Sequence, residues 1–366
     1  MKESHSQFEQ RKRDHIRIAL DPKSQTEGQS GLDSIELIHE ALPDMDFEEV
    51  EISTSFSFPQ LSFKQSFSLS SPLFISSMTA GHLQGESINR ALARLSDRRQ
   101  ILMGVGSQRK ELSDSNAALE WKKVREQAPN AKLIGNIGIS QLIKTSLKDI
   151  QNLIYGLEAC ALFIHLNPLQ EVIQPEGTPQ FRGGLKAISE VVKALEIPVI
   201  IKEVGSGFSV STLKRLQEAG VSAVDVSGKG GTHWGRVETY RSSEESSAYQ
   251  LGQTFANWGI STVQSLMNAK TAQVGYEVWA SGGVRNGLDV AKLCALGAQK
   301  VGMAQPFLMA ALAGCSQNDG TSNSFDDEKS DLALNTFLDR IELELKTALF
   351  CTGARTLKDL ESKLSN

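Results

Sequence analysis

The chain has 366 residues, of which 40% are hydrophobic and 22% charged, and its formal net charge is -5. This composition supports a large buried core and excludes a disordered polymer. A general nucleic-acid-binding protein needs a basic face, so the acidic balance argues against a nucleic-acid partner, although a local basic pocket for a small anion stays compatible with it.

Cysteine use and hydropathy predict a cytoplasmic protein. The 4 cysteines are widely spaced and include no C-x-x-C pair. This spacing argues against a disulfide scaffold or a zinc site and fits a reducing compartment. The first ten residues contain no apolar core of a secretory signal. No stretch approaches the roughly 18 apolar residues of a membrane span, so no membrane partner is expected.

Residues 1–70 are interpreted as an N-terminal extension. A basic cluster at 11–17 opens it, and phenylalanine alternates with serine or another polar residue over 52–70. A period of two is typical of short, half-buried strands, here a hairpin. The serine content leaves a flexible linker as the alternative. The basic cluster is either a solvated face or tail, or an arm that folds over a binding site.

Short apolar runs and helical patterns alternate from residue 71 to 313. The runs lie at 73–78, 101–106, 132–138, 161–166, 198–205, 222–228, 277–283 and 300–304, and helical patterns lie at 88–95, 116–127, 149–157, 184–196, 210–219, 287–296 and 307–313. This alternation predicts an α/β fold, a (β/α)8 TIM barrel, whose strands are apolar because both faces are buried. A doubly wound open sheet is the alternative, but the glycine-rich dinucleotide turn that it usually carries is absent after the first run.

The remaining segments are assigned by composition. The loops at 167–182 and 228–257 are unusually long. Loops of this length are usually functional lids or disordered segments. Residues 314–334 are polar and acidic and predict a disordered insertion. Residues 335–366 predict C-terminal helices that pack on the barrel.

In a barrel, chemistry collects at the carboxyl ends of the strands. Those ends carry small or polar residues: Thr79, Ser107, Asn136, His165, Lys202, Ser227, Gly282, Gly283 and Ala304. For any single position, contact with water at the strand end is a sufficient reason for a polar residue. The glycines follow the seventh strand, where bare backbone N–H groups bind a phosphate in many barrels and Arg285 adds charge. A pair of tight turns is the alternative.

Two further features carry candidate chemistry. Lys202 lies inside an apolar strand, where a charge is costly to bury without a partner. Four roles are open for it: forming a Schiff base, holding a phosphate, facing a reduced flavin, or only pairing with Glu203 or Asp225. The stretch HLNPLQEVIQPEG (165–177) is dense in polar groups. Its Glu171 is a reasonable anchor for Mg²⁺ whose other ligands are diphosphate oxygens and water, or is simply solvated. A lone His165 is commonly a satisfied buried histidine.

The chain resembles the type 2, flavin-dependent isopentenyl-diphosphate isomerases. The matching stretches are collinear over nearly the whole chain: RKRDHI (11–16), PLFISSMTAGH (72–82), GVGSQR (104–109), GNIG (135–138), HLNPLQEVIQPEG (165–177), IIKEVGSG (200–207), DVSGKGGTHW (225–234), ASGGVRNGLDVAK (280–292) and GARTLKDL (353–360). The resemblance implies a barrel that interconverts isopentenyl and dimethylallyl diphosphate by a 1,3-proton shift. It implies reduced FMN as the acid/base, Mg²⁺ on the diphosphate, NADPH as the reductant, and a homo-tetramer or homo-octamer.

The resemblance also assigns roles to residues. The flavin ring would contact Ser76, Ser77, Met78, Thr79, Ser107, Asn136 and Lys202. The ribityl phosphate would be held by Ser227, Thr232, Gly282, Gly283, Val284, Arg285, Ala304 and Gln305. The substrate would contact Arg11, Lys12, Ser107, Gln108, Arg109, His165, Asn167 and Gln170. Gln170, His165 and Lys202 would take part in the chemistry, and Glu171 would bind Mg²⁺.

Three other classes of protein remain as alternatives. A flavin-dependent oxidase or dehydrogenase of small 2-hydroxy acids needs a His-Arg pair, which THWGR (232–236) loosely resembles. A lyase would use Lys202 as a Schiff base on a phosphorylated substrate. A non-catalytic scaffold would have no need of the polar strand ends.

Overall fold

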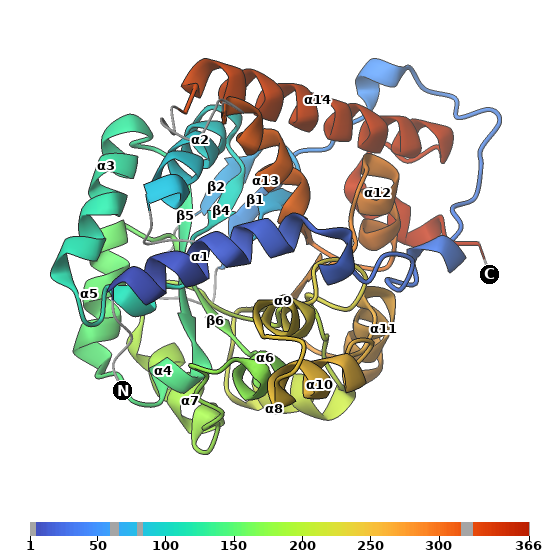
Figure 1. The fold of residues 1–366 in the computed structure, drawn as a ribbon. Coiled ribbons are helices and arrows are strands. Elements are labelled where there is room, and N and C mark those ends of the chain that lie inside the picture. The colour runs from blue at the N-terminus through green and yellow to red at the C-terminus, as the bar shows by residue number, and fades with distance from the viewer. Residues whose placement is uncertain (1–4, 59–65, 79–82, 316–324, 366) are drawn as a thin grey trace.

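The described part of the chain forms a closed barrel of eight parallel strands (Figure 1). The computed structural model describes residues 5–58, 66–78, 83–315 and 325–365. The barrel strands are β3 Leu73–Ile75, β4 Leu102–Gly104, β5 Lys132–Gly138, β6 Ala161–His165, β7 Val199–Lys202, β8 Ala223–Asp225, β9 Glu277–Ser281 and β10 Lys300–Met303. Because β10 pairs with β3, the sheet has no open edge. The predicted (β/α)8 barrel is confirmed, and the open doubly wound sheet is wrong.

The predicted helical patterns correspond to helices around the barrel. These helices are α2 Leu83–Arg99, α3 Leu119–Gln127, α5 Leu147–Leu157, α7 Gly184–Ala194, α8 Val210–Glu218, α12 Gly287–Ala295 and α13 Gln305–Ala311. Several begin at a side-chain cap: the Ser146 hydroxyl accepts from the backbone N–H of Asp149, and Ser209 accepts from that of Thr212. The strands stay apolar because the helices cover their outer face and the barrel interior covers the other.

The two predicted long loops contain helices that the hydrophobic pattern misses. The first holds α6 Pro168–Ile173, and the second holds α9 Trp234–Arg241 and α10 Ser247–Thr254. Beyond it, α11 Thr262–Ala272 is the missing barrel helix, and α4 Ile139–Leu142 is a short helix after β5. Several of these helices bury small or polar residues beside only one large apolar residue, as α9 buries Gly235, Glu238 and Thr239 beside Val237. A helix that buries polar groups has no apolar stripe to detect.

The N-terminal hairpin closes the amino end of the barrel. Strands β1 Thr54–Ser57 and β2 Ser66–Leu69 are antiparallel, with Phe56 opposite Phe67, so the predicted hairpin is confirmed. Phe56 packs with Phe74, Phe163 and Trp279 in one buried cluster inside the barrel. The ring centroids of Phe56 and Trp279 lie 6.4 Å apart. The interior at this end is therefore a packed aromatic core.

Helix α1 His5–Leu20 crosses the opposite end, and α14 Asp327–Cys351 runs along the side of the barrel (Figure 1). Arg94 of α2 donates to the carboxylates of Asp327 and Asp331 at 2.7 and 2.8 Å. The C-terminal helical segment thus begins at Asp327, inside the range for which the sequence predicts disorder. Residues 316–324 of that range lie outside the described residues.

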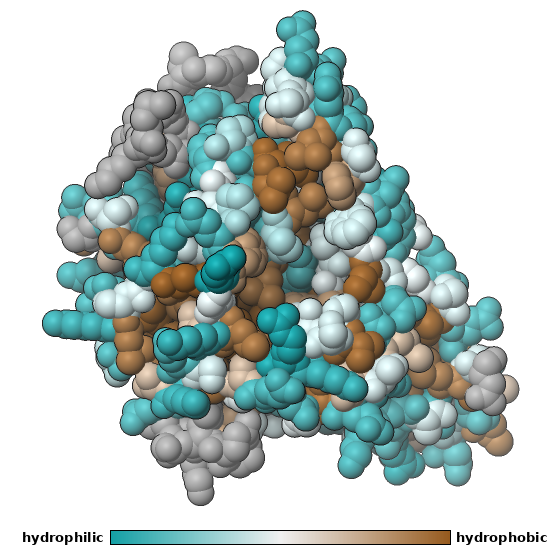
Figure 2. Space-filling view, turned by 90° about the horizontal axis from the view of Figure 1, so that it is seen from below, coloured by the Kyte–Doolittle hydropathy of each residue, from teal (hydrophilic) through white to brown (hydrophobic). Residues whose placement is uncertain are grey.

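The surface seen from below is mostly hydrophilic, with hydrophobic residues in separate groups (Figure 2). Scattered exposed hydrophobic residues are normal for a folded protein. Over the ranges that the structure covers, none of the helices has both the length and the apolar character needed to cross a membrane.

The aromatic core predicts a large stability effect at Phe56. Phe56→Ala removes a side chain that is 1% exposed, and we expect it to lower the free energy of unfolding by about 3–5 kcal/mol. Tyr155→Ala is the control, because Tyr155 is 70% exposed and its loss should change stability by less than about 0.5 kcal/mol. Urea denaturation of both variants measures the difference. Equal midpoints would show that the hairpin does not contribute to the core.

Candidate active site

Polar side chains at the carboxyl ends of the strands line three adjoining pockets at the barrel mouth. We name them the His165 pocket, which also contains Glu171; the glycine pocket, which contains Gly282 and Gly283; and the apolar pocket, which contains Ile16. Ser77 and Trp234 line all three, and Lys202 lines the first two. The mouth is therefore one composite site roofed by α1.

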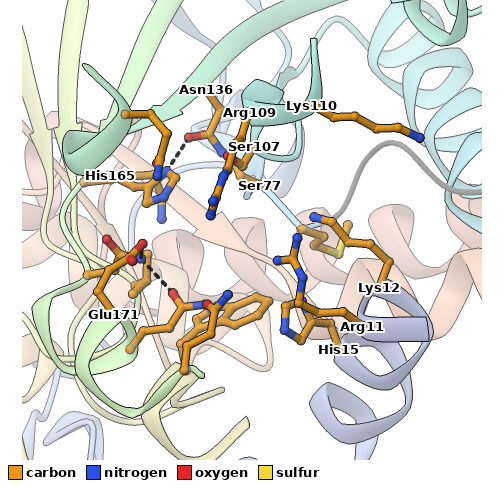
Figure 3. Close-up of a pocket in the computed structure, with 18 of the residues that line it drawn as sticks. Arg11, Lys12, His15, Ser77, Ser107, Arg109, Lys110, Asn136, His165 and Glu171 are labelled. Carbon is orange, nitrogen blue, oxygen red and sulfur yellow. Dashed lines mark hydrogen bonds between the residues drawn. The ribbon is translucent and has the colours of Figure 1, made fainter. Parts of the chain in front are cut away.

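Most residues predicted from the sequence meet in these pockets. The His165 pocket is lined by Arg11, Lys12, Ser77, Met78, Ser107, Arg109, Asn136, His165, Asn167, Gln170, Glu171 and Lys202. The glycine pocket is lined by Ser76, Ser77, Lys202, Ser227, Thr232, Gly282, Gly283, Val284, Arg285, Ala304 and Gln305. Thr79 lies outside the described residues. In Figure 3 the α1 residues Arg11 and Lys12 lie across the cavity from His165 and Glu171, and Arg109 points into it.

Gln108 lies behind the pocket wall, where it holds β5 in place. Its side-chain oxygen accepts from the backbone N–H of Asn136 at 3.0 Å, and its amide donates to Glu111 at 3.1 Å. Glu111 also accepts from the indole of Trp121 at 2.8 Å. Burial raises the pKa of Glu111 to about 7. The side chain of Gln108 lines none of the three pockets and contacts Asn136 and Glu111 instead, so its contact with a substrate stays a prediction.

His165 is neutral and has a defined tautomer. Its Nδ1 lies 2.8 Å from Asn136 Oδ1, and the Asn136 amide nitrogen donates to the carbonyl of Val105 at 2.9 Å. This second bond orients the Asn136 oxygen toward the ring, so Nδ1 carries the proton and Nε2 is left as an acceptor. Burial, with Lys202 and Lys12 nearby, lowers the pKa of His165 to about 3. His165 is thus a hydrogen-bonding group at neutral pH and carries no charge.

Asn167 and Glu171 present oxygen atoms at the start of α6. The Asn167 amide donates to Gln170 at 3.0 Å and to Glu171 at 3.1 Å, and Glu171 also accepts from the backbone N–H of Thr178. The other side-chain atom of Asn167, Oδ1, is buried and has no hydrogen-bond partner. Among the described residues no cluster of three metal-ligating side chains occurs. A cation at Glu171 would therefore draw most of its ligands from a bound anion and water.

Glu238 lies behind the pocket wall and positions two lining residues, and the sequence analysis missed it. This buried carboxylate accepts from His15 of α1 at 2.9 Å, from Gln170 of α6 at 3.1 Å, and from Arg241. Arg241 also donates to Glu176 at 2.9 Å. Burial alone would raise the pKa of Glu238, but His15 and Arg241 outweigh it and hold the value at about 2. Glu238 lies in a segment predicted as a loop. The matched stretch DVSGKGGTHW (225–234) ends four residues before it, and no other motif in the sequence pointed to it.

Lys202 sits between the two polar pockets. Its ammonium donates to the backbone carbonyl of Glu203 at 2.7 Å. Burial lowers the pKa of Lys202, while the carboxylates of Asp225 and Glu203 oppose that shift. Asp225 is held by two contacts of 2.9 Å from the Ser281 hydroxyl. The hydrogen bond of Lys202 therefore goes to the backbone of Glu203, the carboxylates of Glu203 and Asp225 act on it through their charge, and Lys202 lines both pockets.

The glycine pocket combines closely packed glycines with unpartnered hydroxyls. Gly282 and Gly283 have φ of 102° and 82°, and a Cβ on Gly283 would lie 2.8 Å from the carbonyl oxygen of Gly230. Only glycine fits a backbone so placed. The hydroxyls of Ser76 and Ser77 are buried and lack hydrogen-bond partners. Arg285 reaches Gln25 at 3.4 Å. The pocket thus places the unpartnered hydroxyls of two serines near a glycine backbone that no side chain covers.

The His-Arg pair required by the hydroxy-acid alternative serves the fold. His233 caps α9 through the backbone N–H of Arg236 and bonds to the carbonyl of Trp258 at 3.0 Å. Arg236 donates to the carbonyls of Ala256 and Gln25. Neither side chain lines any of the three pockets. The pair therefore lies outside the site.

The fold and the mouth define a class, a (β/α)8 barrel with a glycine-lined pocket after β9. The sequence profile of the FMN-dependent dehydrogenase family matches residues 170–366. The fold is similar to a mandelate oxidase mutant with a monooxide FMN adduct, at a TM-score of 0.59 and 15% identity, covering 96% of this chain and 91% of that chain. It is also similar to a flavocytochrome b2 with sulfite bound, at a TM-score of 0.64 and 18% identity, covering 96% and 82%.

Curated relatives match the chain from end to end. A protein of Bdellovibrio bacteriovorus named isopentenyl-diphosphate delta-isomerase is 64% identical over 99% of both chains. A protein of the same name from Legionella pneumophila is 49% identical over 99% of both chains. One from Halobacterium salinarum is 39% identical over 97% of this chain and 92% of its own. The chain therefore belongs to the isopentenyl-diphosphate delta-isomerase family.

The neutral state of His165 predicts a pH effect on stability. Its folded pKa of about 3 is below the ordinary 6.5, so the unfolded chain binds more protons and stability falls as the pH drops below 6.5. From pH 7 to 5 this single group should cost about 2 kcal/mol. His165→Asn should lose that much less stability between pH 7 and 5. The exposed His39 supplies the control His39→Asn. Identical pH slopes for His165→Asn and the unsubstituted protein would contradict the assignment.

Proposed function

We propose that the chain interconverts isopentenyl and dimethylallyl diphosphate with reduced FMN, with Mg²⁺ bound to the diphosphate. The observation that carries this proposal is the joining of two unlike half-sites at one barrel mouth. The glycine pocket offers backbone and hydroxyl donors, and the His165 pocket offers cations and a carboxylate. Both share Lys202 and Trp234. The names of the full-length relatives support the substrate.

FMN fits the unsatisfied donors of the glycine pocket. Gly282, Gly283 and Arg285 would hold its phosphate, because a bare backbone lets N–H groups approach an anion closely. The orphan hydroxyls of Ser76 and Ser77 would bond to the ring system. When bound and reduced, preferably by NADPH, the flavin supplies an electron-rich ring with a proton donor and acceptor nitrogen. Lys202, which faces both pockets, would place its positive charge against that ring.

The substrate diphosphate would bind in the His165 pocket. Arg11 and Lys12 from α1 and Arg109 from the β4 loop line it. Charge-assisted hydrogen bonds from such groups are the strong contacts to phosphate oxygens. Glu171 and the unpartnered oxygen of Asn167 would hold Mg²⁺ together with diphosphate oxygens.

The chain's own residues would then control a proton shift without net redox change. One proton is added at the terminal alkene carbon and one is removed from C2. Gln170 is fixed between Asn167 and Glu238, so its amide has a set orientation toward the substrate. Neutral His165 offers Nε2 as an acceptor. Helix α1 and Trp234 cover the mouth and would exclude water from a cationic intermediate. A homo-tetramer or homo-octamer in the cytoplasm belongs to the same proposal.

An anaerobic assay tests this function. The purified chain is mixed with isopentenyl diphosphate, FMN, Mg²⁺ and either NADPH or dithionite, and dimethylallyl diphosphate is quantified. We expect product that disappears when flavin or reductant is omitted and falls strongly when Mg²⁺ is chelated. Tight FMN binding without product would favour a hydroxy-acid oxidoreductase instead. Absence of both would favour the Lys202 lyase, which borohydride trapping with a phosphorylated carbonyl substrate would detect.

The cradle predicts a specific loss of FMN affinity. Gly283→Ala adds a Cβ at 2.8 Å from the Gly230 oxygen in a backbone with φ of 82°, and we expect FMN to bind at least about tenfold more weakly. Gly156→Ala is the matched control, because a Cβ there meets no atom within 4 Å. Fluorescence titration of FMN measures both. Unchanged affinity in Gly283→Ala would remove the glycine pocket from the proposal.

A further inference from the structure

The ring of Phe8 gathers three cations at the edge of the His165 pocket. The Arg11 guanidinium carbon lies 5.2 Å from the ring centroid, the Lys12 ammonium 5.5 Å, and the Lys110 ammonium 4.7 Å. All four residues line the pocket. The sequence analysis assigned no role to Phe8 or Lys110.

These cations come from two separate elements. Phe8, Arg11 and Lys12 lie three and four positions apart on α1, so they share one face of the helix. Lys110 ends the short 3-10 helix Gln108–Lys110 that follows β4, beside Arg109. In Figure 3 its side chain extends to the side of the pocket that carries Lys12. The Phe8 ring therefore connects the roof of the mouth to the β4 loop.

Three like charges around one ring repel one another, and the negative face of an aromatic ring offsets part of that repulsion. Arg11 and Lys12 are only 8% and 7% exposed, so water screens their charges less than it screens surface groups. An anion with several charged oxygens can contact cations from more than one element at the same time. A diphosphate offers oxygens on two phosphorus atoms, enough to meet cations from both elements.

We propose that Phe8 and Lys110 complete the diphosphate site of this chain. Lys110 contacts the outer phosphate directly, and Phe8 is a positioning residue that holds Arg11, Lys12 and Lys110 at the spacing a diphosphate requires. This inference rests on the proposed function, because it deepens the recognition of the same substrate. It predicts a preference for a diphosphate over a monophosphate, because a diphosphate carries more charged oxygens for cations from both elements.

The test measures binding of inorganic pyrophosphate and of orthophosphate to the full chain by calorimetry, with Mg²⁺ held constant. Phe8→Leu keeps an apolar side chain and removes the ring, and we expect pyrophosphate to bind about fivefold more weakly. Phe8→Tyr should stay within about twofold of the unsubstituted protein. Lys110→Met should weaken pyrophosphate about tenfold, and Lys110→Arg should restore most of it. The effect on orthophosphate should be smaller in every variant.

A matched control for the ring exists at the other end of the barrel. Lys132 lies 4.8 Å from the ring centroid of Phe67 in β2, outside the three pockets. Phe67→Leu removes the same kind of contact and should leave pyrophosphate affinity unchanged. In the isomerase assay, Phe8→Leu should raise KM for the substrate and leave kcat nearly unchanged, a split that general loosening of α1 would not produce. Added salt should reduce the difference between Phe8→Leu and the unsubstituted protein.

The outcomes separate this inference from the proposed function. Pyrophosphate binding that is the same in Phe8→Leu, Lys110→Met and the unsubstituted protein would overturn the inference and leave the isomerase proposal standing. Failure of the unsubstituted protein to bind pyrophosphate would overturn both. Weakening in Phe8→Leu together with rescue in Phe8→Tyr would support the positioning role, even if the leucine variant folds less stably.

Discussion

The buried carboxylate of Glu238 holds the mouth of the barrel together. It accepts hydrogen bonds from α1 through His15, from α6 through Gln170, and from Arg241 at the end of its own helix α9. A carboxylate without such donors would be costly to bury, so the three elements and the charge depend on one another. Placement of Arg11 and Lys12 over the pocket follows from the His15 contact, because all three lie on α1.

The other end of α1 is attached to the glycine pocket. The backbone carbonyl of Ala19 accepts from Gln25 at 2.8 Å and from Gln305 at 3.1 Å, and Gln25 in turn contacts Arg285. One helix is thus fixed to both half-sites, at His15 and at Ala19. This arrangement explains how a chain with a net charge of -5 forms a cationic pocket. The positive groups are brought together locally by α1, the β4 loop and β7.

The sequence predicted what depends on local pattern. Eight apolar runs predicted eight strands because a strand buried on both faces has to be apolar throughout. The alternation of Phe56 and Phe67 with polar neighbours predicted the hairpin. Polar residues at strand ends, such as Asn136 and His165, predicted a site because parallel strands in a barrel bring their carboxyl ends into one ring. The sequence did not predict helices α9 and α11 because each buries only one large apolar residue, Val237 or Leu266, among small or polar ones.

By itself, the sequence determined the barrel, the position of the site at its mouth, and the family resemblance carried by the collinear matched stretches. Tertiary structure alone decided which side chains of the mouth face the cavity. Gln108 turned out to lie behind the wall, while Phe8, His15, Lys110 and Trp234 line the pocket. It also decided that His233 and Arg236 belong to the fold. The reason is physical: hydrogen bonds between distant elements set side-chain direction, and residues such as His15 and Glu238, separated by 223 positions, share no local pattern.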